Sequence, residues 1–188
     1  MSNKISELDP KALWKHFYNL TQVPRPSKKE EKIIAFMKKF GEDLGLETIV
    51  DGVGNVIIKK PATSGMENRK TVVLQGHLDI VPQKNSDKIF DFETDPIEPF
   101  IEDGWVTADG TTLGADNGMG VAAAMSILES DNLQHGPIEA LFTIDEETGM
   151  TGAFGLKAGI LMVISLLIWT LKMKVNCMWV VPEVQMAI

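Results

Sequence analysis

Three pairs of polar residues follow apolar or β-prone runs of the chain, and their side chains are of the types that bind metals. The pairs are His77 with Asp79, Asp116 with Asn117, and Glu146 with Glu147. Imidazole nitrogens and carboxylate oxygens are ligands that zinc takes in proteins. In α/β proteins, binding sites form beyond the ends of the strands. The three pairs are therefore candidate parts of one hydrolytic metal site.

His77 and Asp79 stand at the end of a continuous β-prone run. Residues two apart on an extended strand point to the same side, so the Asp79 carboxylate can orient the His77 ring. Carboxylates take this place behind zinc-bound histidines. A single His-x-Asp pair is more often an ordinary strand-end pair, so the metal interpretation depends on the order of all three pairs.

Glu146 and Glu147, taken alone, indicate a solvated acidic turn, but the other two pairs favour a second interpretation. Adjacent carboxylates at a strand end usually point apart, so one could bind a metal while the other accepts a proton from a metal-bound water. Asp116 follows Gly114 and Ala115. These small residues would let its carboxylate approach two ions closely and bridge them, as two-metal hydrolases require.

The spacing of apolar residues predicts three helices around these pairs. The first covers residues 9–24, where prolines end it. The second covers residues 27–41, with Ser27 as its N-cap and Glu30 in the capping-box position. The third starts near Asn117 and continues to about Leu133.

The expected strands alternate with these helices, which predicts an α/β domain. Two strands form a hairpin, two are buried runs of the kind found inside a sheet, and a short one lies in a long ordered loop over residues 84–112. The hairpin strands cover residues 47–50 and 55–58, and the buried strands cover residues 71–75 and 138–144. The short strand in the loop covers residues 105–107.

Composition limits the class of protein. The chain has 188 residues, 44% of them hydrophobic, which suits one packed domain. Its formal charge of -8, without a basic cluster, excludes nucleic acid as a partner. The single cysteine, Cys177, cannot form an internal disulfide, and the N-terminus lacks the apolar segment of a secretory signal. We expect a cytoplasmic protein.

The motifs GHLDIVP, LGADNG and TIDEETGMTGA resemble the successive active-site motifs of the M20 metallopeptidases. With the stretch DFETDPIEP, they are similar to aminoacyl-histidine dipeptidases, and the resemblance covers about residues 5–160. It implies a zinc-peptidase-like mixed sheet flanked by helices. It also implies residue roles: His77 binds one zinc, Asp79 orients His77, Asp116 bridges both ions, Glu146 is the general base and Glu147 binds the other zinc.

The resemblance further implies a hydrolase for small peptides that uses two zinc ions and a metal-bridging water. Such enzymes are far longer, carry a lid or dimerisation domain, and take two more ligands downstream, an aspartate and a late histidine. A homodimer is expected for the full-length enzyme. His16 and His135 lie outside the motifs, and we interpret them as ordinary surface or capping histidines. The catalytic domain is therefore expected to be incomplete, and this truncated form inactive.

The composition changes abruptly at Ile160, since only Glu183 of the 26 acidic residues lies beyond residue 159. In a shifted reading frame, each new codon consists of the last base of one present codon and the first two bases of the next. In that frame, the codons of Trp169 and Thr170 must give aspartate. The shifted text can read NLDTEDEGELYVGCAGG, which looks like the family's next motif with its aspartate ligand. We predict that residues 1–160 belong to the catalytic domain and that residues 161–188 are an out-of-frame apolar tail outside the native fold.

Alternatives remain for both the tail and the function. The tail could be a genuine apolar helix or a membrane anchor, although residues 160–171 are too few for a span, which needs roughly 20. The enzyme could be another M20 amidohydrolase or a deacylase, because the residues that read the substrate are not in this sequence. The chain could also be a non-catalytic fragment with weak or no metal binding.

Overall fold

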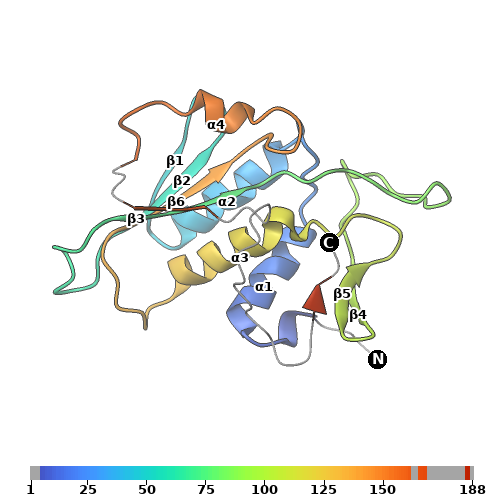
Figure 1. Ribbon diagram of the computed structural model, residues 1–188, viewed down its shortest axis with the longest axis horizontal. Coiled ribbons are helices and arrows are strands. Elements are labelled where there is room, and N and C mark those ends of the chain that lie inside the picture. Colours follow the sequence, from blue (N-terminus) through green and yellow to red (C-terminus); the bar gives the residue numbers. More distant parts are fainter. Residues whose placement is uncertain (1–4, 162–164, 169–184, 187–188) are drawn as a thin grey trace.

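The computed structural model describes residues 5–161, 165–168 and 185–186 (Figure 1). Its helices are a short 3-10 helix η1 (Ile5–Glu7) and the α-helices α1 (Lys11–Thr21), α2 (Glu31–Asp43), α3 (Ala115–Glu129) and α4 (Thr151–Gly155). Its strands are β1 (Glu47–Val50), β2 (Val56–Lys60), β3 (Val72–His77), β4 (Pro99–Glu102), β5 (Trp105–Ala108), β6 (Ile138–Thr143), β7 (Ser165–Ile168) and β8 (Gln185–Met186).

The main sheet has five strands in the order β1-β2-β6-β3-β7. β2 runs antiparallel to both β1 and β6, whereas β3 runs parallel to β6 and β7. β3 and β6 are paired in a register that places His77 opposite Thr143. Both strands therefore end at the same edge of the sheet, which brings the segments after them side by side.

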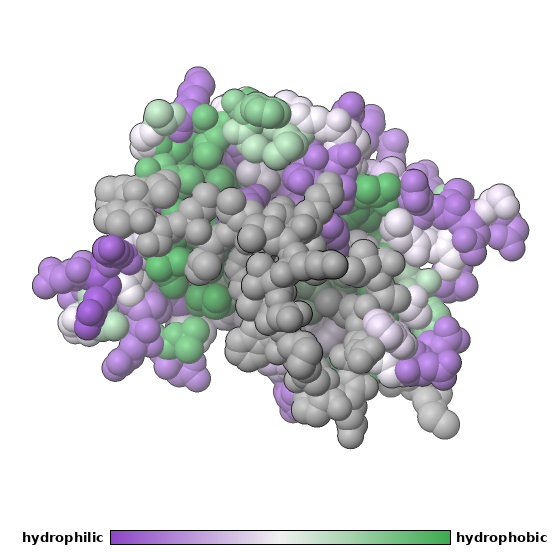
Figure 2. All heavy atoms as spheres, viewed as in Figure 1, coloured by the Kyte–Doolittle hydropathy of each residue, from purple (hydrophilic) through white to green (hydrophobic). Residues whose placement is uncertain are grey.

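Alternation of side chains along the strands gives the sheet two different faces. One face carries Val56, Leu74 and Phe142 into the main core, which α1, α2 and α3 complete. The other face carries a small cluster of Ile57, Val73 and Leu141. Figure 2 shows apolar side chains gathered over α4 at the surface of the molecule. The mixed sheet with its helices confirms the predicted α/β fold class.

The predicted hairpin and the two buried strands are confirmed, but two helix boundaries are wrong. α2 begins at Glu31 and not at Ser27. α3 ends at Glu129, four residues before Leu133, and its first turn has non-helical φ and ψ angles at Asp116 and Asn117. The predicted long loop contains β4 and β5, which pair as an antiparallel hairpin.

The tail beyond residue 160 is only partly within the described residues. β7 lies parallel to β3 at the edge of the main sheet, and β8 pairs with β5 in a second, three-stranded sheet. Residues 162–164, 169–184 and 187–188 lie outside the described part of the chain, so most of the predicted out-of-frame segment lies there too. Within the described part of the chain, none of the helices has the length and hydropathy needed to cross a bilayer.

Candidate metal centre

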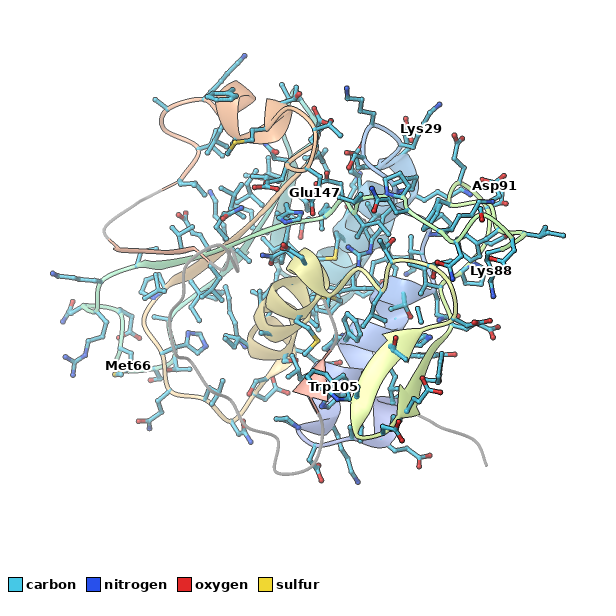
Figure 3. The ribbon with its side chains drawn as sticks, turned by 45° about the vertical axis from the view of Figure 1, so that its right-hand side comes forward. Lys29, Met66, Lys88, Asp91, Trp105 and Glu147 are labelled. Carbon is cyan, nitrogen blue, oxygen red and sulfur yellow. The ribbon has the colours of Figure 1, made fainter. Side chains whose placement is uncertain are left out.

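The structure brings His77, Asp116 and Glu147 together from three elements. His77 is the last residue of β3, Asp116 lies in the first turn of α3, and Glu147 follows β6. One ligand atom from each residue lies within 4.8 Å of the other two. Figure 3 labels Glu147 near the middle of the molecule, close to the start of α3. The side chain of Glu146 faces the same place, with its Oε2 3.8 Å from His77 Nε2.

Hydrogen bonding orients the His77 ring so that Nε2 faces the cluster. The ring nitrogen Nδ1 lies 3.1 Å from the backbone carbonyl oxygen of Asp79. A carbonyl can only accept, so Nδ1 carries a proton, and Nε2 is the nitrogen that faces the cluster. Nε2 lies 3.2 Å from Asp116 Oδ1. A histidine held in this way is prepared for a metal at Nε2.

The Asp79 carboxylate is fully buried and has more partners than the sequence indicates. Its Oδ1 lies 3.4 Å from His77 Nδ1 and accepts the backbone N–H of Glu146 at 3.0 Å. Its Oδ2 accepts the backbone N–H of Glu147 at 3.1 Å and the hydroxyl of Ser27 at 2.7 Å. Burial alone would raise the pKa of Asp79, but these bonds and that of His77 lower it to about 2. Asp79 therefore holds the Glu146–Glu147 turn as well as facing the ring.

The segment before α2 also differs from its prediction. Ser27 does not cap α2, because the helix begins at Glu31 with Glu30 in the N-cap position, and the Ser27 hydroxyl donates to Asp79. Glu30 accepts the backbone N–H groups of Lys28 and Asp145, at 2.9 and 3.0 Å. The side chains of Ser27 and Glu30 thus bond to the turns that contain the site residues. A capping pattern in the sequence could not reveal partners so far away along the chain.

Arg25 is a buried residue of the site's surroundings that sequence reasoning missed. Its Nη1 donates to the carbonyl of Leu78 at 2.9 Å and its Nη2 to the carbonyl of Gly114 at 2.8 Å. It thereby ties the segment after His77 to the segment before Asp116. Burial lowers the pKa of Arg25 to about 10, against the opposing effect of Asp79, so the guanidinium stays charged at neutral pH.

The glycines beside Arg25 explain the small residues before Asp116. Gly114 has a φ of 72°, and a Cβ built there would lie 2.8 Å from Arg25 Nη2. A Cβ at Gly118 would lie at the same distance from that atom. Gly114 and Ala115 were predicted to let metal ions approach closely, whereas in the structure Gly114, together with Gly118, makes room for Arg25.

The charges of the cluster suit a cation. Burial acts to lower the pKa of His77, but Asp116, Asp79 and Glu146 together raise it to about 9. Burial, with the neighbouring carboxylates of Asp116 and Glu146, raises the pKa of Glu147. Several carboxylates in one small region disfavour one another's ionised forms, and a bound cation relieves that repulsion.

The other two histidines are not part of this cluster. His16 is only 2% exposed, so its interpretation as a surface residue is wrong. Its Nε2 lies 2.8 Å from Glu129 Oε2, at the opposite end of α3 from Asp116. His135 Nδ1 lies 2.7 Å from the carbonyl oxygen of Gly136 in a loop.

The fold and the cluster are those expected of a metal-dependent hydrolase, and comparison with known proteins defines the class further. Residues 73–179 match the peptidase family M20/M25/M40. The chain belongs to this family. The family resemblance of the three sequence motifs is thereby confirmed.

Two dipeptidases are among the similar proteins. The cytosol non-specific dipeptidase of Escherichia coli (strain K12) is 51% identical over 155 residues, which are 82% of this chain and 32% of that protein. The crystal structure of an aminoacylhistidine dipeptidase from Vibrio alginolyticus matches with a TM-score of 0.87 and 53% identity, over 89% of this chain and 34% of that one. This chain spans about a third of the length of each.

A more distant structure is the aminopeptidase PepT from Bacillus cereus ATCC 10987. It matches with a TM-score of 0.73 and 28% identity, over 87% of this chain and 44% of that chain. The fold of most of this chain is therefore shared with a peptidase that differs considerably in sequence.

Proposed function

We propose that this chain carries the N-terminal part of the catalytic domain of a zinc-dependent dipeptidase that acts on aminoacyl-histidine peptides. The convergence of His77, Asp116 and Glu147 within 4.8 Å carries the proposal. The similarity to the Escherichia coli non-specific dipeptidase supports dipeptides as substrates, and the similarity to the aminoacylhistidine dipeptidase from Vibrio supports the aminoacyl-histidine class. The name of the Escherichia coli relative also supports a cytosolic location.

One nitrogen and two carboxylate ligands form a donor set that fits zinc. In the proposed site, His77 and Glu147 would each hold one zinc ion, and Asp116 would be the ligand common to both. Bound zinc would polarise the scissile carbonyl and lower the pKa of a water molecule. The described residues supply three ligands, and the family resemblance implies two more, an aspartate and a histidine.

Glu146 is the proposed general base. Its backbone is fixed by Asp79, and its carboxylate lies 3.8 Å from His77 Nε2 with the side chain 20% exposed. From this position it can take a proton from the attacking water and return it to the leaving amine of the peptide. Asp79 remains ionised throughout, because its low pKa keeps it from competing for that proton.

The 188-residue chain by itself is proposed to be a poor enzyme. The described residues hold three of the five ligands that the resemblance implies. A chain with this half-built site can bind zinc weakly and still fail to hold a substrate carbonyl correctly, because catalytic geometry tolerates errors of only about 0.5 Å.

A matched pair of proteins tests the proposed activity. The gene is read in the shifted frame from about Leu161 into the downstream sequence, and the product is prepared with and without Glu146→Gln. We expect hydrolysis of an aminoacyl-histidine dipeptide by the first and a loss of roughly 100-fold or more in the second, with zinc content unchanged. Near-normal turnover by Glu146→Gln would contradict its role, and cleavage of N-acyl amino acids in place of dipeptides would indicate a deacylase.

A further inference from the structure

We propose that Glu30 is a positioning residue for the Glu146–Glu147 pair and that it acts through the backbone of Asp145. The inference rests on the proposed function only for the roles of Glu146 as general base and Glu147 as zinc ligand. Three successive backbone N–H groups after β6 each donate to a buried carboxylate from elsewhere in the chain. The N–H of Asp145 donates to Glu30 at 3.0 Å, and those of Glu146 and Glu147 donate to Asp79 at 3.0 and 3.1 Å.

The turn that these bonds hold is wound around Asp145. This residue has a φ of 53°, a value uncommon outside glycine. Its carbonyl accepts the N–H of Met150 at 2.6 Å, and its carboxylate accepts the hydroxyls of Thr148 and Thr151. The turn is therefore internally braced, and Asn55 holds its two ends through the N–H of Ile144 and the carbonyl of Gly152. Between those ends, the bonds to Glu30 and Asp79 orient the N–H groups of Asp145, Glu146 and Glu147.

The side chain of Glu30 is built into this arrangement and makes no capping hydrogen bond to α2, although Glu30 is the N-cap residue of that helix. It is 5% exposed, and its Oε1 accepts both the N–H of Lys28 and the N–H of Asp145, which lies 115 residues away in the sequence. A residue that served only α2 would have no reason to reach the strand-end turn. Burial raises the pKa of Glu30, and the nearby Asp79 acts in the same direction, while the bonds from the N–H groups of Lys28 and Asp145 act to lower it.

The consequence concerns the direction in which the two glutamates point. A fixed Asp145 N–H sets the plane of the peptide that joins Ile144 to Asp145, and the two Asp79 bonds set the next two peptides, which lead into Glu146 and Glu147. Without Glu30, the N–H of Asp145 loses its carboxylate acceptor, while the bonds to Asp79 and Asn55 remain. The segment that leads into Glu146 and Glu147 is then less firmly held, and their carboxylates can move away from His77. Supporting partners of metal ligands typically contribute 10- to 100-fold in metal affinity, and we expect about 10-fold here.

Amide hydrogen exchange of the metal-free 188-residue chain tests the positioning directly. Glu30→Ala should speed exchange at Asp145, Glu146 and Glu147 by at least about tenfold, as expected for loss of a bond to a buried carboxylate. Glu30→Gln should restore the wild-type rates, because its carbonyl oxygen accepts the same bonds. Glu31→Gln is the matched control, since this neighbouring glutamate is exposed and should leave the three amides unchanged.

Unchanged exchange at these three amides in Glu30→Ala would overturn the proposal, as would faster exchange spread evenly over the whole chain. If Glu30→Ala does not fold, Glu30→Asp carries the same test, because its shorter side chain cannot reach both N–H groups. Zinc titration adds a second readout, in which Glu30→Ala should bind about tenfold more weakly. Equal affinity would also overturn the proposal. Failure of the wild-type chain to bind zinc would contradict the proposed metal centre, while the exchange rates would still decide the role of Glu30.

Discussion

Asp79 Oδ1 accepts the backbone N–H of Glu146 at 3.0 Å. This bond joins the segment after β3 to the segment after β6, which is possible because the two strands are parallel neighbours ending at one edge of the sheet. The carboxylate behind the His77 ring is thus also the group that fixes the proposed base. One buried side chain therefore holds both halves of the site in place.

Replacement of Asp79 by asparagine should therefore damage the site and the fold together. The amide places an N–H₂ group where a carboxylate oxygen now accepts N–H or O–H donors, so at least one donor loses its partner. We expect a loss of about 2 kcal/mol in the free energy of unfolding, measured in urea, and zinc binding that is roughly 10- to 100-fold weaker. Asp87→Asn, in an exposed loop, is the control and should change neither quantity.

The low pKa of Asp79 gives this contribution a definite pH range. Its folded pKa of about 2 lies below the ordinary value of 3.8, so the stabilisation is fully present above pH 3.8 and is lost as the pH falls towards 2. The difference in unfolding free energy between wild type and Asp79→Asn should shrink over that range. A difference that stays constant down to pH 2 would contradict the assignment.

Zinc binding should release a proton from His77. Neighbouring carboxylates outweigh burial and raise its pKa to about 9, whereas a zinc-bound imidazole must be neutral at the binding nitrogen. The apparent zinc affinity should therefore rise between pH 6.5 and 9, and calorimetry at pH 7.5 in two buffers should register the released proton. His77→Ala should abolish binding, while His135→Ala, outside the cluster, should bind as the wild type does.

Gly114→Ala should be destabilising through two separable effects. Its φ of 72° disfavours any side chain, and the new Cβ would lie 2.8 Å from Arg25 Nη2 and 2.9 Å from Ile80 Cγ2. Gly45→Ala isolates the first effect, because Gly45 has a φ of 69° and no atom within 4 Å of the added Cβ. We expect Gly45→Ala to cost about 1 kcal/mol and Gly114→Ala about 1–3 kcal/mol more. Equal costs in chemical denaturation would argue against the tight packing around Arg25.

The strands that frame the site could be predicted from continuous β-prone runs in the sequence. β6 is a fully buried run and β3 a nearly buried one, so their β-prone sequences and the polar residues after them indicate strand ends directly. The start of α2 was mispredicted because Ser27 has the residue type of a cap, whereas its hydroxyl donates to Asp79, 52 residues away, and Lys28 after it has a left-handed φ of 69°. Local preference gave way to a tertiary hydrogen bond.

The same limit applies to the supporting residues of the site. Arg25 stands between two prolines, where a surface turn is the ordinary expectation, and its buried carbonyl partners are 53 and 89 residues away. Glu30 bonds to a backbone group 115 residues away. No local pattern encodes such pairings, whereas the polar pairs at the strand ends could be recognised by residue type and order.

The tail prediction can be decided by the gene. If residues from about Met162 onward are out of frame, the gene should have one or two bases inserted or deleted near Leu161, compared with the genes of other family members. Limited proteolysis supplies an independent measurement, since cleavage confined to the region after Ile160 should leave a stable remainder. A tail as resistant as β3, and required for folding, would show that it belongs to the native protein.

His16 should make the stability of the chain depend on pH below neutrality. The ring is 2% exposed and packs edge-on against Phe40, with Nε2 2.8 Å from Glu129 Oε2, and no hydrogen-bond partner for Nδ1 is found among the described residues. Burial lowers the pKa of His16, although the bond to Glu129 opposes this, and Lys15 adds a small further decrease. The buried ring is therefore neutral at pH 7 and donates its Nε2–H to Glu129.

Because the folded pKa lies below 6.5, the unfolded chain takes up the proton first as the pH falls. The contribution of His16 to stability is thus constant above pH 6.5 and decreases below it. We expect the free energy of unfolding to fall between pH 6.5 and 5 in the wild type and to fall less in His16→Gln, whose amide can still donate to Glu129. His77 acts in the opposite sense, since its raised pKa of about 9 makes its contribution fade as the pH rises above 6.5. Both the wild type and His16→Gln contain His77, so its effect cancels in their comparison. Parallel profiles of unfolding free energy against pH below 6.5 would show that His16 takes up its proton in the folded chain as readily as in the unfolded one.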